Sequence, residues 1–342
     1  MTREDGLPNE HLIQNIVQQI AGLKQNGKQV ILVSSGAVAA GRSVFKSKKK
    51  LDTVAERQLL SSLGQVKLIN LYTSFFNEFD QLCAQVLVTK QDFKDRNHYL
   101  NMQNCLNAIL SNAIIPIVNE NDVISITELM FTDNDELAGL ISAMLNVDIL
   151  YILTNVDGIY DGNPELESSS VISEFKLTSQ HLSKITTNVK SNFGRGGIVT
   201  KCHTAQRVAA TGIPVVIANG NTPNIINRLE GGEQLGTLFK PKKMTSSRKK
   251  WIAHSHSNAK GHVIVNEGAK NSLISKTAVS LLPVGIVQIK GDFQKGDIIK
   301  ILDENNEEIG LGQSRYSSAK AGSLIGIKNQ KPIIHYDHLY LH

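Results

Sequence analysis

Cysteine is scarce in this chain, and its few residues follow no disulfide or metal-binding pattern. Cys83, Cys105 and Cys202 are odd in number, lie far apart and form no CxxC pair. Disulfide frameworks and structural zinc sites both depend on paired, closely spaced cysteines. The sequence therefore argues against either kind of site, and it fits a reducing cytoplasm, where we expect this protein to reside.

Long hydrophobic runs are absent as well. A helix that spans a bilayer needs about 20 consecutive apolar residues, and no apolar run in this sequence approaches that length. The first ten residues, MTREDGLPNE, contain no apolar segment of the kind found in signal peptides. We therefore expect neither membrane association nor export.

The chain also lacks a strong charge imbalance. Its formal net charge is +5 over 342 residues, and much of the excess lies in two basic stretches within residues 46–50 and 240–250. We interpret these stretches as a solvated loop and a linker, although such clusters can attract anions or nucleic acid over long range. Residues from about 251 onward contain few aromatic side chains for base stacking, so we expect no nucleic-acid partner.

The first 240 residues alternate short apolar runs with amphipathic helical stretches. The predicted strands are residues 30–33, 85–88, 114–118, 149–153 and 215–218, and the predicted helices are residues 11–25, 59–79, 101–112, 136–145 and 200–211. Strands that are rich in Val, Ile and Leu on both faces, with helices between them, indicate a parallel sheet covered on both sides. The predicted fold class is α/β, with a mostly parallel sheet flanked by helices.

The pattern changes after residue 240. A Lys/Ser-rich stretch is followed by short strand candidates separated by Gly and Asn/Asp turns, without long helical patterns. These candidates are residues 262–265, 285–289, 297–301 and 332–335. We predict a first domain over residues 1–240, a linker at 241–250 and a small β-rich domain over 251–342.

Polar segments follow several predicted strands, at the edge where open α/β sheets bind ligands. Residues 34–41, SSGAVAAG, combine small side chains with a helix start whose backbone amides can hold an anion. Residues 119–122 and 132–136, NEND and TDNDE, offer amides and carboxylates for a polar substrate, and aspartate can hold magnesium through water. Ordinary turn formation explains part of each pattern.

Two further segments suit a nucleotide. Residues 154–160, TNVDGIY, follow a predicted strand, although a simple loop would have the same composition. Residues 193–201, FGRGGIVTK, combine three glycines and a helix start with Lys201, which would neutralise phosphate charge. This is neither a Walker motif nor GxGxxG, and a flexible loop is the alternative. Together the segments favour phosphoryl transfer, which needs positioning and charge compensation more than covalent chemistry.

The same segments resemble glutamate 5-kinases of the amino-acid kinase superfamily, and the match runs almost end to end. In chain order they are VSSGAVAAG, LLSSLGQVKLINLY, DFKDRNHYLN, IPIVNENDVI, FTDNDELAGLIS, ILTNVDGIYDGNP and GRGGIVTK. The NENDVI, TDND and SSGAVAAG segments separate this branch from acetylglutamate kinases and aspartokinases. Near the C-terminus, NEGAKNSLISKTAVSLLPVGIVQIKGDFQKGD and SRYSSA are similar to the PUA domain of many bacterial members.

The resemblance implies ATP- and Mg²⁺-dependent phosphorylation of the side-chain carboxylate of L-glutamate to L-glutamyl 5-phosphate, the first step of proline biosynthesis. It implies catalytic roles for Lys201, which would neutralise the transferring phosphoryl group, and for Asp135, which would orient catalytic lysines or metal. The implied substrate-binding residues are Ser35, Gly36, Asp122 and Asn134. The implied ATP-binding residues are Thr154, Asn155, Arg195, Gly196, Gly197, Ile198, Val199, Thr200 and Lys201.

The resemblance also sets expectations for cofactors and assembly. Mg²⁺ would be carried mainly by the ATP phosphates, since no further metal ligands are assigned. Relatives commonly assemble as dimers or tetramers, so a homo-oligomer is expected, and proline is the expected feedback inhibitor.

The sequence departs from the family pattern at several points. Asn155 replaces a common aspartate, Thr132 replaces a glycine just before Asp133, and Arg195 stands where a small residue is usual. The family normally opens with a strand of the form Val-Val-Lys-Val-Gly-Ser, and residues 1–6 align just after it. One phosphate-facing lysine would then be missing. Our hypothesis is a start codon assigned too late or a truncated chain.

Three alternatives stay open from the sequence alone. The missing lysine motivates an inactive or regulatory paralogue, and the PUA-like segment motivates an RNA-binding protein. A sister kinase that acts on another acid is the third. Turnover of L-glutamate against N-acetylglutamate, and a salt-dependent RNA gel shift, separate these alternatives.

Overall fold

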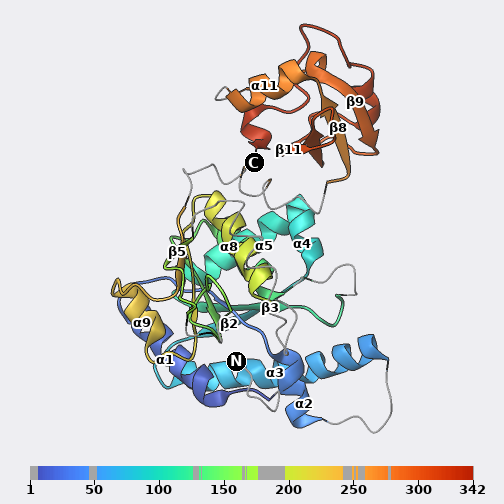
Figure 1. Ribbon diagram of the computed structural model, residues 1–342. Coiled ribbons are helices and arrows are strands. Elements are labelled where there is room, and N and C mark those ends of the chain that lie inside the picture. The colour runs from blue at the N-terminus through green and yellow to red at the C-terminus, as the bar shows by residue number, and fades with distance from the viewer. Residues whose placement is uncertain are drawn as a thin grey trace. The chain divides into compact units, whose positions relative to one another are not determined.

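The computed structural model describes residues 7–45, 52–125, 131, 133–163, 166, 168–175, 197–241, 249, 252, 259–275 and 279–341. The chain forms two compact units (Figure 1). One comprises Met1–Ala209 with Ile213–Pro241, and the other comprises Lys242–His342 with Ala210–Gly212.

The strands of the first unit form two sheets. The strands β1 (Leu32–Val33), β3 (Ile115–Glu120) and β2 (Cys83–Val88) lie in that order in a three-stranded sheet, and both pairings are parallel. The second sheet has the order β4 (Leu150–Thr154), β6 (Val215–Asn219), β7 (Thr237–Phe239) and β5 (Glu174–Phe175). Only its β6–β7 pairing is antiparallel. The predicted α/β fold with a mostly parallel sheet is confirmed, with its strands divided between two sheets.

Helices cover both sides of these sheets (Figure 1): α1 and α3 lie on one side, and α4, α5 and α8 lie on the other. The helices of this unit are α1 (Glu10–Gln25), α2 (Ala37–Val44), α3 (Thr53–Asn77), α4 (Lys90–Lys94), α5 (Arg96–Ser111), α6 (Asn134–Leu145), α8 (Ile198–Ala210) and α9 (Ile225–Glu230). None of the described helices has the length and apolar character needed to cross a membrane.

One apolar core joins the two sheets. Ile16 of α1 and Tyr72 of α3 belong to the same buried cluster as Ile117 of β3 and Ala218 of β6. A second cluster packs α8 against β4 and β6 on the opposite side. Burial on both sides fixes how the carboxyl ends of the strands lie relative to one another, and these ends carry the polar segments identified in the sequence.

Helix α3 begins six residues before the predicted start at residue 59. Asp52 caps the helix, because its carboxylate accepts hydrogen bonds from the backbone N–H groups of Val54 and Ala55. The prediction relied on apolar periodicity, which is weak in the first turn. Because the helix begins at Thr53, Arg57 lies inside it.

Strand β1 is shorter than predicted. Residues 30–33 were expected to form a buried strand, whereas the observed strand comprises only Leu32–Val33, and both residues are half-buried. Among the described residues β1 pairs on one side only, with β3, which explains its short ladder and its partial exposure.

Two glycines let α2 lie directly on α3. A Cβ atom added at Gly41 would lie 1.9 Å from the carbonyl oxygen of Leu60, and one added at Gly64 would lie 1.7 Å from the carbonyl oxygen of Ala37. Any side chain at either position would push the helices apart. Because α2 begins directly after residues 34–36, this contact also fixes the turn at the carboxyl end of β1.

The second unit contains one five-stranded sheet of order β12-β11-β10-β8-β9. Its elements are β8 (Gly261–Val265), α11 (Glu267–Ser275), η2 (Pro283–Gly285), β9 (Ile286–Gly291), β10 (Ile298–Leu302), β11 (Glu308–Gln313), α12 (Ser318–Gly322), η3 (Tyr336–His338) and β12 (Leu339–Leu341). The β-rich character is confirmed. Its core includes Val263, Phe293 and Ile301, all fully buried.

The predicted strand at residues 332–335 is wrong. Ile334 forms only an isolated bridge with Leu281, although Ile333 and Ile334 are fully buried. Pro332 has no N–H to donate to a ladder, so the apolar run fills the core without extending the sheet. Strands β11 and β12, which contain Gly and Tyr between their apolar residues, were not predicted.

The helix contact predicts a large difference between two glycine substitutions. We expect Gly64→Ala to lower the free energy of unfolding by about 1–3 kcal/mol, because the added methyl group overlaps the Ala37 carbonyl. The matched control is Gly22→Ala in α1, where an added Cβ meets nothing within 4 Å. It should stabilise the protein by about 0.5–1 kcal/mol through helix propensity. Denaturant unfolding of both variants measures the difference, and equal stability would contradict this account of the α2–α3 contact.

Candidate active site

A network of polar groups joins the ends of β1 and β3 to the start of α6. Asn134, the first residue of α6, donates its side-chain amide to the backbone carbonyl of Ser34 and, at 3.3 Å, to Oδ1 of Asn119. The Ser34 hydroxyl lies 2.8 Å from the hydroxyl of Tyr72, which is fully buried. Burial raises the pKa of Tyr72 to about 12, so its hydroxyl stays protonated. Tyr72, on the buried face of α3, therefore helps to hold Ser34, and the Ser34 carbonyl in turn holds the Asn134 side chain.

A second group of polar residues, from α3 and from the carboxyl end of β3, surrounds Asp122. Arg57 donates from Nε to Oδ1 of Asp122 at 3.0 Å and also contacts this oxygen through Nη2. The Ser61 hydroxyl donates to the other Asp122 oxygen at 2.9 Å. Glu120 lies 3.4 Å from Arg57 Nη2, and its other oxygen accepts from the backbone N–H of Phe131 at 3.0 Å. Burial, and next the negative charge of Asp122, raise the pKa of Glu120.

The four predicted substrate-binding residues lie around these two groups. Ser35 is exposed and Gly36 caps α2 with a φ of 103°, a left-handed conformation that favours glycine. Asn134 contacts the residue just before Ser35, and Asp122 is 6% exposed at the end of β3. The substrate-binding role of these residues stays a prediction.

The two predicted catalytic residues form an ion pair. Nζ of Lys201, near the start of α8, lies 2.6 Å from Oδ2 of Asp135, the second residue of α6, and both side chains are mostly buried. The two helices also pack closely near this pair, since a Cβ added at Gly139 of α6 would lie 3.0 Å from the side chains of Thr204 and Val208 of α8. Burial raises the pKa of Asp135 despite the opposing attraction of Lys201.

Asp133 caps α6 with one of its two carboxylate oxygens. Its Oδ1 accepts from the backbone N–H of Glu136 at 2.9 Å, and its Oδ2 is buried without a hydrogen-bond partner among the described residues. Within the part of the chain that the structure describes, no three His, Cys, Asp or Glu side chains form a group that could hold a metal ion. A buried carboxylate oxygen of this kind suits a cation as one of its ligands.

The predicted nucleotide residues occupy two places. Thr154 ends β4, its carbonyl accepts from the Gly220 backbone N–H at 2.7 Å, and its hydroxyl donates to Asn155, which is exposed. On the neighbouring β6, Asn219 donates to Asp157 at 2.8 Å. The carboxyl ends of these parallel strands thus form one polar edge.

The rest of the predicted nucleotide set lies at the start of α8. Gly197 precedes the helix, Ile198, Val199 and Thr200 form its first turn, and all four are half-buried. The Thr200 hydroxyl donates to the Gly197 carbonyl at 2.7 Å. Arg195 and Gly196 lie outside the described residues, as does Thr132.

The sequence analysis missed several residues of the site. It did not single out Arg57, Ser61 or Asn219, and it included Glu120 and Asp157 only as members of the polar segments 119–122 and 154–160, without a role of their own. Asp52 followed by Thr53 and Glu56 is a helix-start signal, and a helix from there would have placed Arg57 and Ser61 on one face, four residues apart. Asn219 directly follows the apolar run 215–218, as Asn119 and Thr154 follow theirs, and the same rule would have selected it.

Comparisons with known proteins show the family of the chain. The model of the amino acid kinase family matches residues 2–219, and that of the PUA domain matches residues 261–335. A glutamate 5-kinase from Bacteroides thetaiotaomicron is 47% identical over 344 residues, covering 100% of this chain and 95% of the relative. One from Chlorobaculum tepidum is 48% identical, covering 100% and 94%, and one from Thermoanaerobacter sp. X514 is 39% identical, covering 97% and 89%. The chain belongs to the amino acid kinase family, among the relatives of glutamate 5-kinases, and carries a C-terminal PUA domain.

Proposed function

We propose that this protein is a glutamate 5-kinase, which transfers the γ-phosphate of ATP to the side-chain carboxylate of L-glutamate. The products are ADP and L-glutamyl 5-phosphate, in the first step of proline biosynthesis. Relatives with this name match nearly the whole chain at up to 48% identity. The observation that carries the proposal is that two adjacent residues, Asn134 and Asp135, contact two different polar clusters.

The start of α6 is where the two substrates would meet. Asn134 contacts the cluster at the ends of β1 and β3, which suits the amino acid, and Asp135 contacts Lys201, which suits the phosphates. The amino ends of α6 and α8 both carry partial positive charge, which favours a transferring phosphoryl group. A single turn of helix therefore connects the acceptor side to the donor side.

The reaction needs charge compensation and alignment from the protein. An oxygen of the substrate carboxylate attacks the γ-phosphorus while the bond from phosphorus to the ADP oxygen breaks, and no protein nucleophile takes part. Lys201 compensates the negative charge that develops on the phosphoryl oxygens. Asp135 holds the Lys201 ammonium group in position, at 2.6 Å. Ser35, Gly36, Asp122 and Asn134 hold L-glutamate, and Thr154, Asn155 and residues 195–201 hold ATP.

Mg²⁺ fits this site as a companion of ATP. When bound, it would supply further charge compensation between the phosphates. Asp133 Oδ2, buried and without a partner among the described residues, and the neighbouring Asp135 are the carboxylates that would face it.

The same proposal assigns the remaining features. Residues 1–240 form the kinase domain, residues 241–250 the linker and residues 251–342 the PUA-like domain. The protein acts in the cytoplasm as a homo-oligomer, with proline as feedback inhibitor. ADP release that depends on L-glutamate, and not on N-acetylglutamate, tests the activity, and ADP release that is independent of both acids would contradict it.

Replacement of Lys201 tests the phosphate side. We expect Lys201→Met to lower kcat by about 10²-fold or more, the effect of removing one group that stabilises transition-state charge. The matched control is Lys28→Met, because Lys28 is 60% exposed and pairs with Glu230 at the surface. Coupled ADP release measures both variants. A Lys201→Met enzyme with the wild-type kcat would rule out the proposed role.

Replacement of Asn134 tests the amino-acid side. We expect Asn134→Ala to raise KM for L-glutamate about tenfold while KM for ATP stays within about twofold, because one orienting hydrogen-bonding group is lost. Asn15→Ala, at an exposed position of α1, is the control for general effects of the substitution. Equal increases in both KM values would show that Asn134 does not distinguish the two substrates.

A further inference from the structure

Helix α3 has an exposed face opposite the one that carries Ser61 and Gly64 into the protein. Over residues 62–77 its exposed residues recur every three or four positions, so they lie along one side of the helix. We call them the α3 stripe, and they are Ser62, Leu63, Val66, Asn70, Thr73, Ser74 and Asn77. None of these residues is charged.

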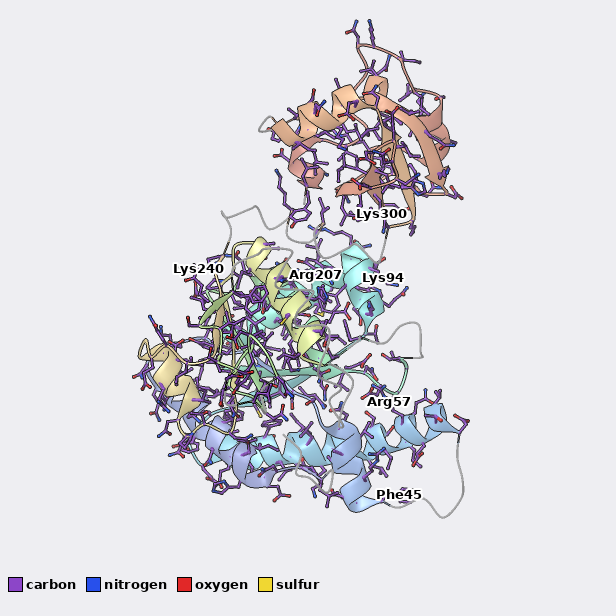
Figure 2. All side chains as sticks on the ribbon, in the orientation of Figure 1. Phe45, Arg57, Lys94, Arg207, Lys240 and Lys300 are labelled. Atoms are coloured by element: carbon purple, nitrogen blue, oxygen red, sulfur yellow. The ribbon has the colours of Figure 1, made fainter. Side chains whose placement is uncertain are left out.

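Large apolar side chains form part of the α3 stripe and of its border on α2. Val66 is 61% exposed and Val44 of α2 is 54% exposed. Leu63 is exposed as well, and so is Phe45, which caps the end of α2 (Figure 2). An open groove of about 520 Å³ is lined by Val44 and by stripe residues that include Leu63 and Val66. Apolar surface that gathers on two adjacent helices in this way is typical of a protein–protein contact.

The hydroxyl groups of the stripe can leave water at little cost. Those of Ser62, Thr73 and Ser74 donate to backbone carbonyls one turn earlier in α3, at 2.7, 2.8 and 2.9 Å. A buried hydroxyl is costly only when it lacks a hydrogen bond. These three keep their hydrogen bonds when the face is covered, so the stripe behaves as a largely apolar surface.

The charge pattern favours a second copy of this chain as the partner. The one charged residue of α3 over residues 58–77 is Lys67, and its Nζ lies 2.9 Å from the Ser43 hydroxyl and 3.8 Å from a carboxylate oxygen of Glu10. A two-fold contact joins the same surface of both copies, so a charge near the axis meets its own like charge. A neutral face avoids that repulsion, and it offers a charged partner no group to pair with.

Asn70 lies at the middle of the stripe and suits a two-fold axis. Its amide has donors and an acceptor, and no hydrogen bond within the described part of the chain involves it. Two Asn70 side chains that meet at an axis can each donate one hydrogen bond and accept one. A single asparagine in an apolar helix contact fixes the register and the number of chains in this way.

We propose that the α3 stripe, together with Val44 and Phe45, is the face through which two copies of this chain pack about a two-fold axis, with Asn70 next to the axis. This proposal rests on the homo-oligomer of the proposed function and deepens it by naming the contact. Because Ser61 on the opposite face of α3 holds Asp122, the contact supports the helix that positions this carboxylate.

The test places charge on the stripe of the full chain and on a matched helix face. Asn70→Asp keeps the size of the side chain, and Leu63→Glu adds a carboxylate to the apolar part of the stripe. The controls are Asn104→Asp and Leu100→Glu on α5, at exposed positions on the other side of the sheets (Figure 1). Sedimentation velocity over a range of protein concentrations measures association, and circular dichroism checks that each variant is folded.

We expect the wild type to form dimers or assemblies of dimers. Asn70→Asp and Leu63→Glu should each raise the dimer dissociation constant about tenfold or more, because each copy brings an unpaired carboxylate into a covered face. Both α5 controls should associate as the wild type does. Asn70→Lys alone should also dissociate, whereas an equimolar mixture of Asn70→Asp and Asn70→Lys chains should associate again, since opposite charges then meet at the axis.

Three results would overturn the proposal. A wild type that stays monomeric at every concentration would mean that no second copy covers the stripe. Folded stripe variants that associate as the wild type does would place the contact elsewhere, and a mixture that stays dissociated would remove Asn70 from the axis. ADP release is measured separately. A wild type that associates through the stripe but releases no ADP contradicts the proposed activity only, and an active protein whose stripe variants associate normally contradicts this proposal only.

Discussion

The contact between the starts of α6 and α8 is the constraint on which the proposed chemistry depends. Lys201 and Asp135 are mostly buried and lie 2.6 Å apart, and Gly139 of α6 packs closely against Thr204 and Val208 of α8 near this pair. Removal of either partner would leave a buried charge uncompensated, which is strongly unfavourable. The ion pair therefore keeps a lysine pointed at the phosphate site before any ligand arrives, so little reorganisation remains for the reaction itself.

The amino-acid side is fixed by a different part of the fold. Helix α3 contributes Tyr72 to the core, Arg57 and Ser61 to Asp122, and Gly64 to the contact with α2. One long helix thus sets the positions of the turn after β1 and the segment after β3. Since Asn134 contacts that turn while Asp135 contacts Lys201, the two sides are connected through adjacent residues of α6.

Much of the fold followed from sequence patterns, and the failures have physical causes. Buried parallel strands such as β3 and β6 are continuous apolar runs, which periodicity detects well. The first turn of α3 was missed because its start is set by the Asp52 cap rather than by apolar residues, and Arg57 was overlooked with it. The run at 332–335 was misassigned because burial of Ile333 and Ile334 does not require a strand. The segments that contain Asn134, Asp135 and Lys201 were found because they follow strands or begin helices. The roles of Asn134 and Asp135 came from the family resemblance, and the contacts that they make depend on distant segments.

A double-mutant cycle on kcat tests the central claim most directly, namely that Lys201 and Asp135 act as one unit. The four proteins are wild type, Lys201→Met, Asp135→Asn and the double variant, assayed by ADP release with saturating L-glutamate and ATP. The account predicts that the double variant is about as slow as the slower single variant, since each substitution already removes the function of the pair. A double variant whose loss equals the product of the two single losses would mean that the residues act independently and would contradict the account.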